Sequence, residues 1–113
     1  MLKDLKLITL DQWLIAQWRH LDKNNVLPSM NLANGCTFSL QASKGHHCKP
    51  VADLADPLDY THFEVYVRLL DSEVFTWFLP FTSETTYDDK YICCNVPKSI
   101  VCKVIEACGG IVN

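Results

Sequence analysis

The chain has 113 residues, of which 49% are hydrophobic and 20% are charged. A chain this apolar can offset its ordering entropy by burial, which excludes an intrinsically disordered protein. Ten Lys and Arg stand against thirteen Asp and Glu, which gives a formal net charge of −3. Proteins held to nucleic acid by phosphate contacts normally carry a basic excess, so we expect no direct nucleic-acid binding. The length predicts one domain over residues 1–113.

The N-terminal residues carry charges of both signs and lack the uninterrupted apolar region of a secretory signal. No apolar run approaches the roughly 20 residues that span a bilayer. These features predict a cytoplasmic protein with no membrane contact. Thiols stay reduced in that compartment, so we expect no disulfide among the six cysteines: Cys36, Cys48, Cys93, Cys94, Cys102 and Cys108.

A helix is predicted near the start of the chain. Thr9 and Gln12 have the spacing of a capping box, so we expect the helix to begin directly after Thr9. Apolar residues then recur with helical spacing, and we expect the helix to end within residues 22–25. The stripe consists of Leu10, Trp13, Leu14, Gln17, Trp18 and Leu21. At such spacing, Trp13 and Trp18, like Trp77 in a later segment, are expected in the core rather than at an interface.

Four segments are predicted as strands. Residues 36–42 and 61–70 alternate apolar and polar side chains, which is typical of strands with one buried face. Residues 71–73 are predicted to turn into a third strand over 74–81, and 91–96 form a short last strand. In the first two strands, the side chains expected to face solvent are Thr37, Ser39, Gln41, His62, Glu64, Tyr66 and Arg68, and those expected to face inward include Phe63, Val65, Val67 and Leu69.

The remaining segments are two connections and a C-terminal helix. Residues 43–59 have no sustained periodicity and predict a long loop, and 82–90 predict a polar loop. Pro97 opens the last helix, which Gly109 and Gly110 end. Together these elements predict an α+β fold: an antiparallel sheet of about four strands with an N-terminal and a C-terminal helix packed on one face.

The densest cluster of metal-ligand residues is His46-His47-Cys48, which Cys36 precedes and His62 follows. Thiolate and imidazole are the ligands that zinc prefers, and a loop could bring these side chains together. However, the spacings of zinc motifs are absent, so we expect no metal and no other cofactor. A metal-binding module built on His46, His47, Cys48 and His62 stays the alternative.

A nucleophilic site is the second candidate, in which Cys48 would pair with His62 and Asp59. Such a site needs a thiolate activated by a nearby imidazole and a third group that orients the ring. The residue types are present, but the strand–turn–helix context of a nucleophile is not. No glycine-rich phosphate loop occurs either. We therefore expect that the protein is not an enzyme, and keep a cysteine-dependent hydrolase as the alternative.

Acidic residues gather in the two predicted loops. Most acidic loop residues are simply solvated, but such patches can also complement a basic protein surface, for example the nucleic-acid groove of a partner. The predicted partner-binding residues are Asp53, Asp56, Asp59, Glu84, Asp88 and Asp89.

Five short stretches lie within residues 40–65 and 96–110: Leu40-Gln-Ala-Ser43, His47-Cys-Lys-Pro50, Tyr60-Thr-His-Phe-Glu-Val65, Val96-Pro97 and Val104-Ile105-Glu106-Ala107-Cys108-Gly109-Gly110. Together they resemble a pattern in small proteins of tailed phages and proteobacterial prophages. That pattern has a "QAS…YC-x-P…YT-x-VEV" core and a "VP…V…VIE-x-HGG" tail.

The chain departs from that pattern at two positions. His47 replaces an aromatic residue, and Cys108 replaces a histidine, which weakens any metal site carried over from the family. The resemblance implies a genetic setting rather than an activity: a small phage accessory protein, a class rich in inhibitors of host defence that includes anti-CRISPR proteins. We therefore expect an inhibitor that binds a host protein, such as a CRISPR effector or another nucleic-acid-binding complex. An immunity protein for a bacterial toxin stays open as a further alternative.

Overall fold

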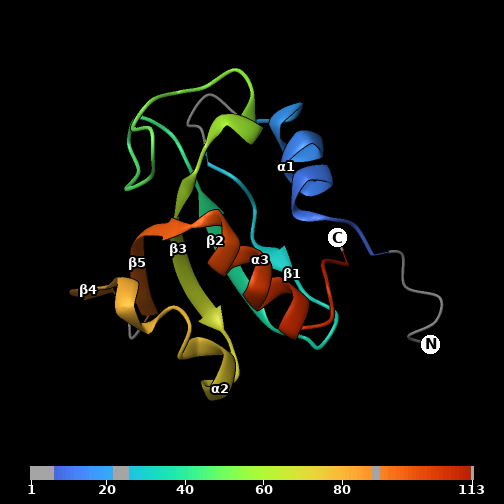
Figure 1. Ribbon diagram of the computed structural model, residues 1–113, viewed down its shortest axis with the longest axis vertical. Coiled ribbons are helices and arrows are strands. Elements are labelled where there is room, and N and C mark those ends of the chain that lie inside the picture. The colour runs from blue at the N-terminus through green and yellow to red at the C-terminus, as the bar shows by residue number, and fades with distance from the viewer. Residues whose placement is uncertain (1–6, 22–25, 88–89, 113) are drawn as a thin grey trace.

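The computed structural model describes residues 7–21, 26–87 and 90–112, and leaves out the side chains of residues 83–91. In this part of the chain five strands form one antiparallel sheet of order β1-β2-β3-β5-β4 (Figure 1). The predicted α+β class is confirmed. The strands are β1 (Met30–Asn31), β2 (Thr37–Gln41), β3 (His62–Leu69), β4 (Thr82–Tyr87) and β5 (Lys90–Pro97). The helices are α1 (Leu10–Trp18), α2 (Ser72–Phe75) and α3 (Lys98–Ala107), with 3₁₀ turns η2 (Pro57–Asp59) and η3 (Leu79–Phe81).

The capping box at the start of α1 is confirmed. The Thr9 hydroxyl accepts a hydrogen bond from the Gln12 backbone N–H at 3.1 Å, and the Gln12 side chain accepts one from the Thr9 N–H at 2.9 Å. The helix is shorter than predicted, because it ends at Trp18. The predicted end at 22–25 lies outside the described residues. Leu10, Trp13 and Leu14 are buried, whereas Trp18 and Leu21 are only partly buried.

The two terminal helices are joined by an ion pair. In α3, the Lys98 ammonium lies 2.8 Å from the Asp11 carboxylate of α1. α3 packs against β5 and crosses in front of the sheet in Figure 1, whereas α1 packs against η2 beside the upper end of the sheet. No described helix is long and apolar enough to cross a membrane.

One face of the sheet forms the apolar core. β2, β3 and β5 contribute side chains with no exposed area, and the apolar side chains of α3 pack in the same cluster. Gly109, with φ +88°, ends α3 in the left-handed conformation, and a Cβ there would lie 3.1 Å from the Ala33 Cβ. This explains why glycine follows the helix. The sheet residues are Phe38, Leu40, Phe63, Val65, Cys93 and Val96; the helix residues are Val101, Val104, Ile105 and Cys108, with Ile100 half-buried.

On the opposite face of the sheet, three polar side chains that were predicted to face solvent are buried. Ser39, Gln41 and Glu64 are 5%, 2% and 4% exposed. The Gln41 side chain donates to the Leu27 carbonyl and accepts from the Leu27 N–H, both at 2.8 Å, so the chain around Leu27 covers this part of β2. Polar groups can be buried when their hydrogen bonds are made, which alternation alone does not reveal. The inward placement of Leu69 is also wrong, since this residue near the end of β3 is 63% exposed.

The predicted strand over residues 74–81 is wrong, because these residues form a helical connection. α2 begins at Ser72, where the hairpin turn was predicted, and η3 follows it. Val74 and Phe78 are four residues apart and both contribute to the core. Phe78 is fully buried, with its ring edge-on to Phe38 at 5.7 Å. The apolar residues of this segment therefore fit the spacing of a helix as well as the alternation of a strand.

The predicted polar loop over residues 82–90 is wrong as well. β4 begins at Thr82 and forms an antiparallel hairpin with β5. Its sequence, TSETTY, is rich in threonine, a β-branched residue that is common in strands although it is polar. The short last strand predicted at 91–96 is confirmed and is longer than expected. The long loop predicted at residues 43–59 is confirmed except for its last turn, η2.

Candidate functional site

The structure does not bring the four metal-ligand candidates together. The His46 imidazole contacts the Ser43 hydroxyl at 2.6 Å, and the His62 imidazole contacts the Thr61 hydroxyl at 2.8 Å. The Cys48 thiol donates to the Ser43 carbonyl at 3.2 Å. Within residues 7–21, 26–87 and 90–112, no group of three or more His, Cys, Asp or Glu could hold a metal ion. The metal-binding alternative therefore has no geometric support in this part of the chain.

The nucleophile candidate, Cys48, is held in a thiol-stabilising environment. It is fully buried, and its thiol lies near the carbonyls of Ser43 and Pro50. Burial raises the pKa of this thiol, and the Glu64 charge raises it further. Catalysis would need a lowered pKa, and the ring of the proposed base, His62, is hydrogen-bonded to Thr61 instead. The Cys48–His62–Asp59 hypothesis therefore has no support in this geometry.

A different polar cluster, not predicted from the sequence, joins the loop at His47 to the sheet. The buried Glu64 carboxylate accepts a hydrogen bond from the His47 backbone N–H at 2.5 Å and lies 3.2 Å from the His47 Nδ1. The Cys94 Sγ lies 3.3 Å from the same ring nitrogen. The Asn95 N–H donates to the His47 carbonyl at 3.0 Å. These contacts fix the 46–48 turn against β3 and β5.

The residue types of this cluster are those of a catalytic triad, but the geometry differs. A nucleophile and an orienting carboxylate use the two different nitrogens of the histidine ring, whereas here both face Nδ1. Burial and the Glu64 charge raise the pKa of the Cys94 thiol, which keeps it protonated. Burial and Glu64 also raise the pKa of the neighbouring Tyr66 to about 12. The arrangement is suited to holding the loop, not to generating a thiolate.

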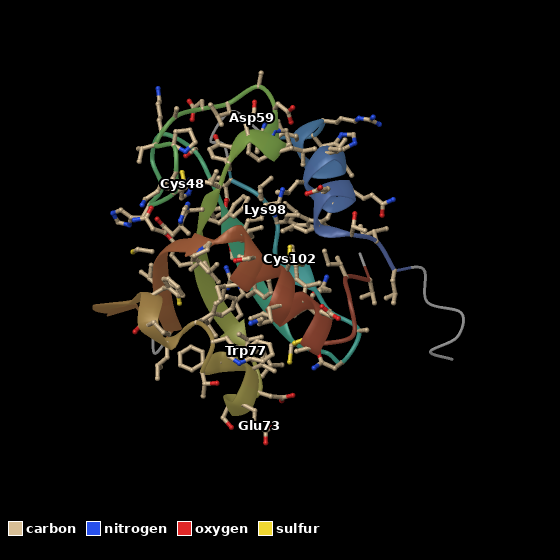
Figure 2. The ribbon with its side chains drawn as sticks, viewed as in Figure 1. Cys48, Asp59, Glu73, Trp77, Lys98 and Cys102 are labelled. Carbon is tan, nitrogen blue, oxygen red and sulfur yellow. The ribbon has the colours of Figure 1, made fainter. Side chains whose placement is uncertain are left out.

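Three of the predicted partner-binding carboxylates lie on the loop that precedes β3. Asp53 accepts a hydrogen bond from the Lys44 N–H at 2.9 Å, and Asp56 caps η2 by accepting from the Leu58 N–H at 2.9 Å. Both are exposed, as is Asp59. Figure 2 shows Asp59 at one end of the molecule and Glu73 at the other. The loop therefore presents three carboxylates from a hydrogen-bonded frame.

The acidic residues predicted in the second segment have no described side chains. Glu84 lies in β4, and the structure describes the backbone at this residue. Asp88 and Asp89 lie outside the described residues.

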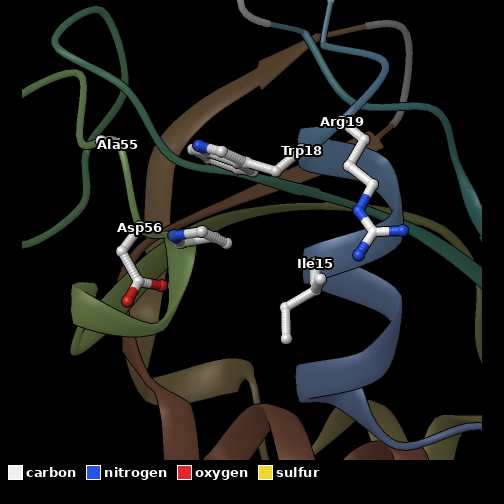
Figure 3. A pocket seen from close by; sticks show the side chains of 6 residues that line it. Ile15, Trp18, Arg19, Ala55 and Asp56 are labelled. Carbon is white, nitrogen blue, oxygen red and sulfur yellow. The ribbon is translucent and has the colours of Figure 1, made fainter.

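A shallow hollow of about 320 Å³ lies beside this acidic loop, where α1 meets residues 55–57. Figure 3 shows Ile15, Trp18 and Arg19 on the helical side and Ala55 and Asp56 on the loop side. Pro57 completes the lining. The hollow has no signal in the sequence, because the two segments that form it are about forty residues apart in the chain.

The three tryptophans have different environments. Trp13 is fully buried, as predicted, and Trp18 is half-buried at the edge of the hollow. Trp77 is 38% exposed, with the Lys103 ammonium 5.9 Å from its ring, so its placement in the core is wrong. Trp18 is therefore the tryptophan that combines a core contact with a cavity wall.

Comparisons with known proteins give no match to this chain: no family model, no curated protein and no solved structure matches it. Two neighbouring features stand out among the described residues: the acidic loop of residues 53–59 and the hollow beside it.

Proposed function

We propose that this protein binds another protein stoichiometrically, as a small phage-type accessory protein that inhibits a host protein in the host cytoplasm. The proposed target is a basic nucleic-acid-binding surface, such as that of a CRISPR effector, which the protein would occlude. The phage setting comes from the sequence resemblance. The observation that carries the binding role is the set of exposed carboxylates of Asp53, Asp56 and Asp59 on one loop.

The loop holds its charges in place before any partner binds. Asp53 and Asp56 each accept a backbone hydrogen bond, and the Tyr60 hydroxyl donates to the Ala52 carbonyl at 2.5 Å. An ordered loop loses little conformational entropy on association. Clustered carboxylates attract a basic surface over a Debye length, which speeds the encounter and makes it dependent on salt.

An enzymatic role has less support in the described residues. The buried thiols of Cys48 and Cys93 have raised pKa values, about 12 for Cys93, and therefore stay protonated near neutral pH. Nor do the imidazoles of His46, His47 and His62 converge on a common point, since each contacts a different neighbour. Binding without chemistry explains the exposed acidic loop and requires no such convergence.

The test begins with affinity capture from bacterial lysate and continues with association kinetics on the captured target. The variant D53N/D56N/D59N removes three charges, and the Asn side chains that replace Asp53 and Asp56 keep an oxygen to accept the existing hydrogen bonds. We expect the association rate at low salt to fall about tenfold or more, and its salt dependence to weaken. The dissociation rate should change less.

The matched control is D71N/E73Q, which removes two exposed carboxylates at the start of α2, the helix at the other end of the molecule in Figure 1. It should associate at the wild-type rate. Equal association rates for the wild type and D53N/D56N/D59N would contradict the acidic-loop proposal. Both roles rely on the same acidic recognition, so the identity of the captured protein separates them. A captured toxin in place of a nucleic-acid-binding protein would favour the immunity-protein alternative.

A further inference from the structure

The hollow beside the acidic loop has an exposed apolar lining. Ile15 is 40% exposed, whereas Leu10 and Leu14 of the same helix are buried. Trp18, which is half-buried, and Pro57, which is buried, also line the hollow. Its volume of about 320 Å³ is at the lower end of the roughly 300–1,000 Å³ of ligand sites. The hollow therefore suits one large side chain better than a cofactor.

The walls of the hollow are fixed by contacts behind them. The Trp18 indole N–H donates to the Leu54 carbonyl at 3.0 Å, and its ring packs edge-on against Tyr60 at 5.7 Å. The Tyr60 hydroxyl in turn accepts from the Leu54 N–H at 3.0 Å. Trp18 is thus positioned before any partner arrives, which lowers the entropy cost of binding. Tryptophan and arginine are also the residues most often found at energetic centres of protein interfaces.

Opposite charges lie on the two sides of the hollow. In Figure 3 the Arg19 guanidinium lies on the α1 side and the Asp56 carboxylate on the loop side. Among the residues that the structure describes, no carboxylate lies within ion-pair distance of Arg19. Asp56 uses one oxygen to cap η2, which leaves the other oxygen available. The charge pattern is thus complementary to a segment with a basic residue on one side and an acidic residue on the other.

We propose that this hollow is the anchor pocket for the partner: it takes one large apolar side chain that a basic and an acidic residue flank on the partner's surface. The apolar side chain lies against Ile15, Trp18 and Pro57, the basic residue pairs with Asp56, and the acidic residue pairs with Arg19. This proposal rests on the proposed protein-binding function and adds where and by what chemistry the partner is held. The charge asymmetry also fixes the direction in which the partner segment lies.

A library of random peptides displayed on phage is the probe, selected on the immobilised wild-type protein. We expect the selected peptides to share a large apolar residue with Lys or Arg on one side and Asp or Glu on the other. Synthetic copies should bind I15E at least about tenfold more weakly, equivalent to about 1.4 kcal/mol. D56N, which can keep the η2 cap, should weaken binding several-fold. The control L79A truncates another exposed apolar residue, on η3, and should bind like the wild type.

A charge swap makes the test independent of any loss of folding. R19E should bind the selected peptides weakly but recover affinity for copies in which the acidic residue is replaced by Lys. Absence of such recovery, or equal binding to the wild type, I15E and D56N, would overturn the anchor pocket. Wild-type protein that dimerises while I15E stays monomeric in sedimentation would also overturn it, because a second copy would then be the occupant.

These outcomes separate the anchor pocket from the binding function itself. A captured target that binds I15E and R19E normally, but binds D53N/D56N/D59N slowly, would reject the pocket and keep the acidic-loop function. A captured target that requires Ile15 and Arg19 but associates normally with D53N/D59N, which leaves Asp56 of the pocket in place, would keep the pocket and reject the acidic-loop role.

Discussion

The two faces of the central sheet are both buried in part, but by different interactions. On one face, Phe38, Phe63 and Cys93 pack in an apolar core with no exposed area. On the other face, Gln41 and Glu64 are nearly as buried, and each is held by hydrogen bonds to backbone groups of covering segments. Apolar burial is non-directional, whereas a buried polar group requires a partner in one position. The polar face therefore specifies where the covering segments lie.

This difference changes what a mutation should break on each face. Removal of an apolar side chain loses contact area and leaves a cavity. Removal of a buried polar side chain loses little area but leaves the groups that it contacted without partners. The core face should therefore determine global stability, and the polar face should determine the position of the chain around Leu27 and of the 46–48 turn.

The largest expected effect is on the core face, at Phe63. This side chain is fully buried in the middle of the core cluster. F63A should lower the free energy of unfolding by about 3–5 kcal/mol, the usual cost of truncating a buried Phe. Urea denaturation followed by circular dichroism measures it. The control L69A removes an exposed side chain from the same strand and should cost no more than about 0.5 kcal/mol.

A smaller effect is expected at Gln41 on the polar face. Q41M keeps most of the volume but leaves the N–H and carbonyl of Leu27 without their present partners. Each buried unsatisfied group costs about 1–3 kcal/mol, less any part recovered from water. The Leu27 amide should also exchange its hydrogen much faster than in the wild type. Unchanged exchange at Leu27 would show that water, not Gln41, satisfies this segment.

The effect that is smallest near neutral pH, because it develops only under alkaline conditions, is expected from the adjacent thiols of Cys93 and Cys94, which lie on opposite faces. Burial raises the pKa of Cys93 from 9.0 to about 12. The unfolded chain releases this proton first, so stability is complete below about pH 9 and falls as the pH rises toward 12. The fall from this one group is at most about 1.4 kcal/mol per pH unit. Urea denaturation at several alkaline pH values measures it.

C93A should flatten this alkaline loss of stability. C94A is the matched control, because Cys94 is the neighbouring residue and its side chain is less buried than that of Cys93. Burial and the Glu64 charge raise the pKa of Cys94 as well. C94A should flatten the loss less than C93A does. Equal slopes for the wild type and C93A would mean that Cys93 titrates alike in the folded and unfolded chains, which its full burial contradicts.

The sequence by itself determined the features that depend on near neighbours in the chain. The capping box of Thr9 and Gln12 starts α1, because its hydrogen bonds join residues three apart. The glycines after α3 end it, because they can adopt a positive φ. The alternation of β2 and β3 also predicted the core side of the sheet, and with it the α+β class. The acidic residues of the 53–59 loop were identified from their place in or next to a predicted loop, and all three are exposed.

Only the tertiary structure decided the features that depend on what covers each segment. Alternation predicted that Glu64 faces solvent, but the turn at His47 covers it and supplies its hydrogen bonds. The apolar pattern of residues 74–81 fits a strand and a helix equally well. In the helical connection that the structure shows, the Phe78 ring contacts Phe38. The hollow required α1 and residues 55–57 to meet. Such contacts join residues far apart in the chain, and local hydrophobic periodicity contains no information about which segments will meet.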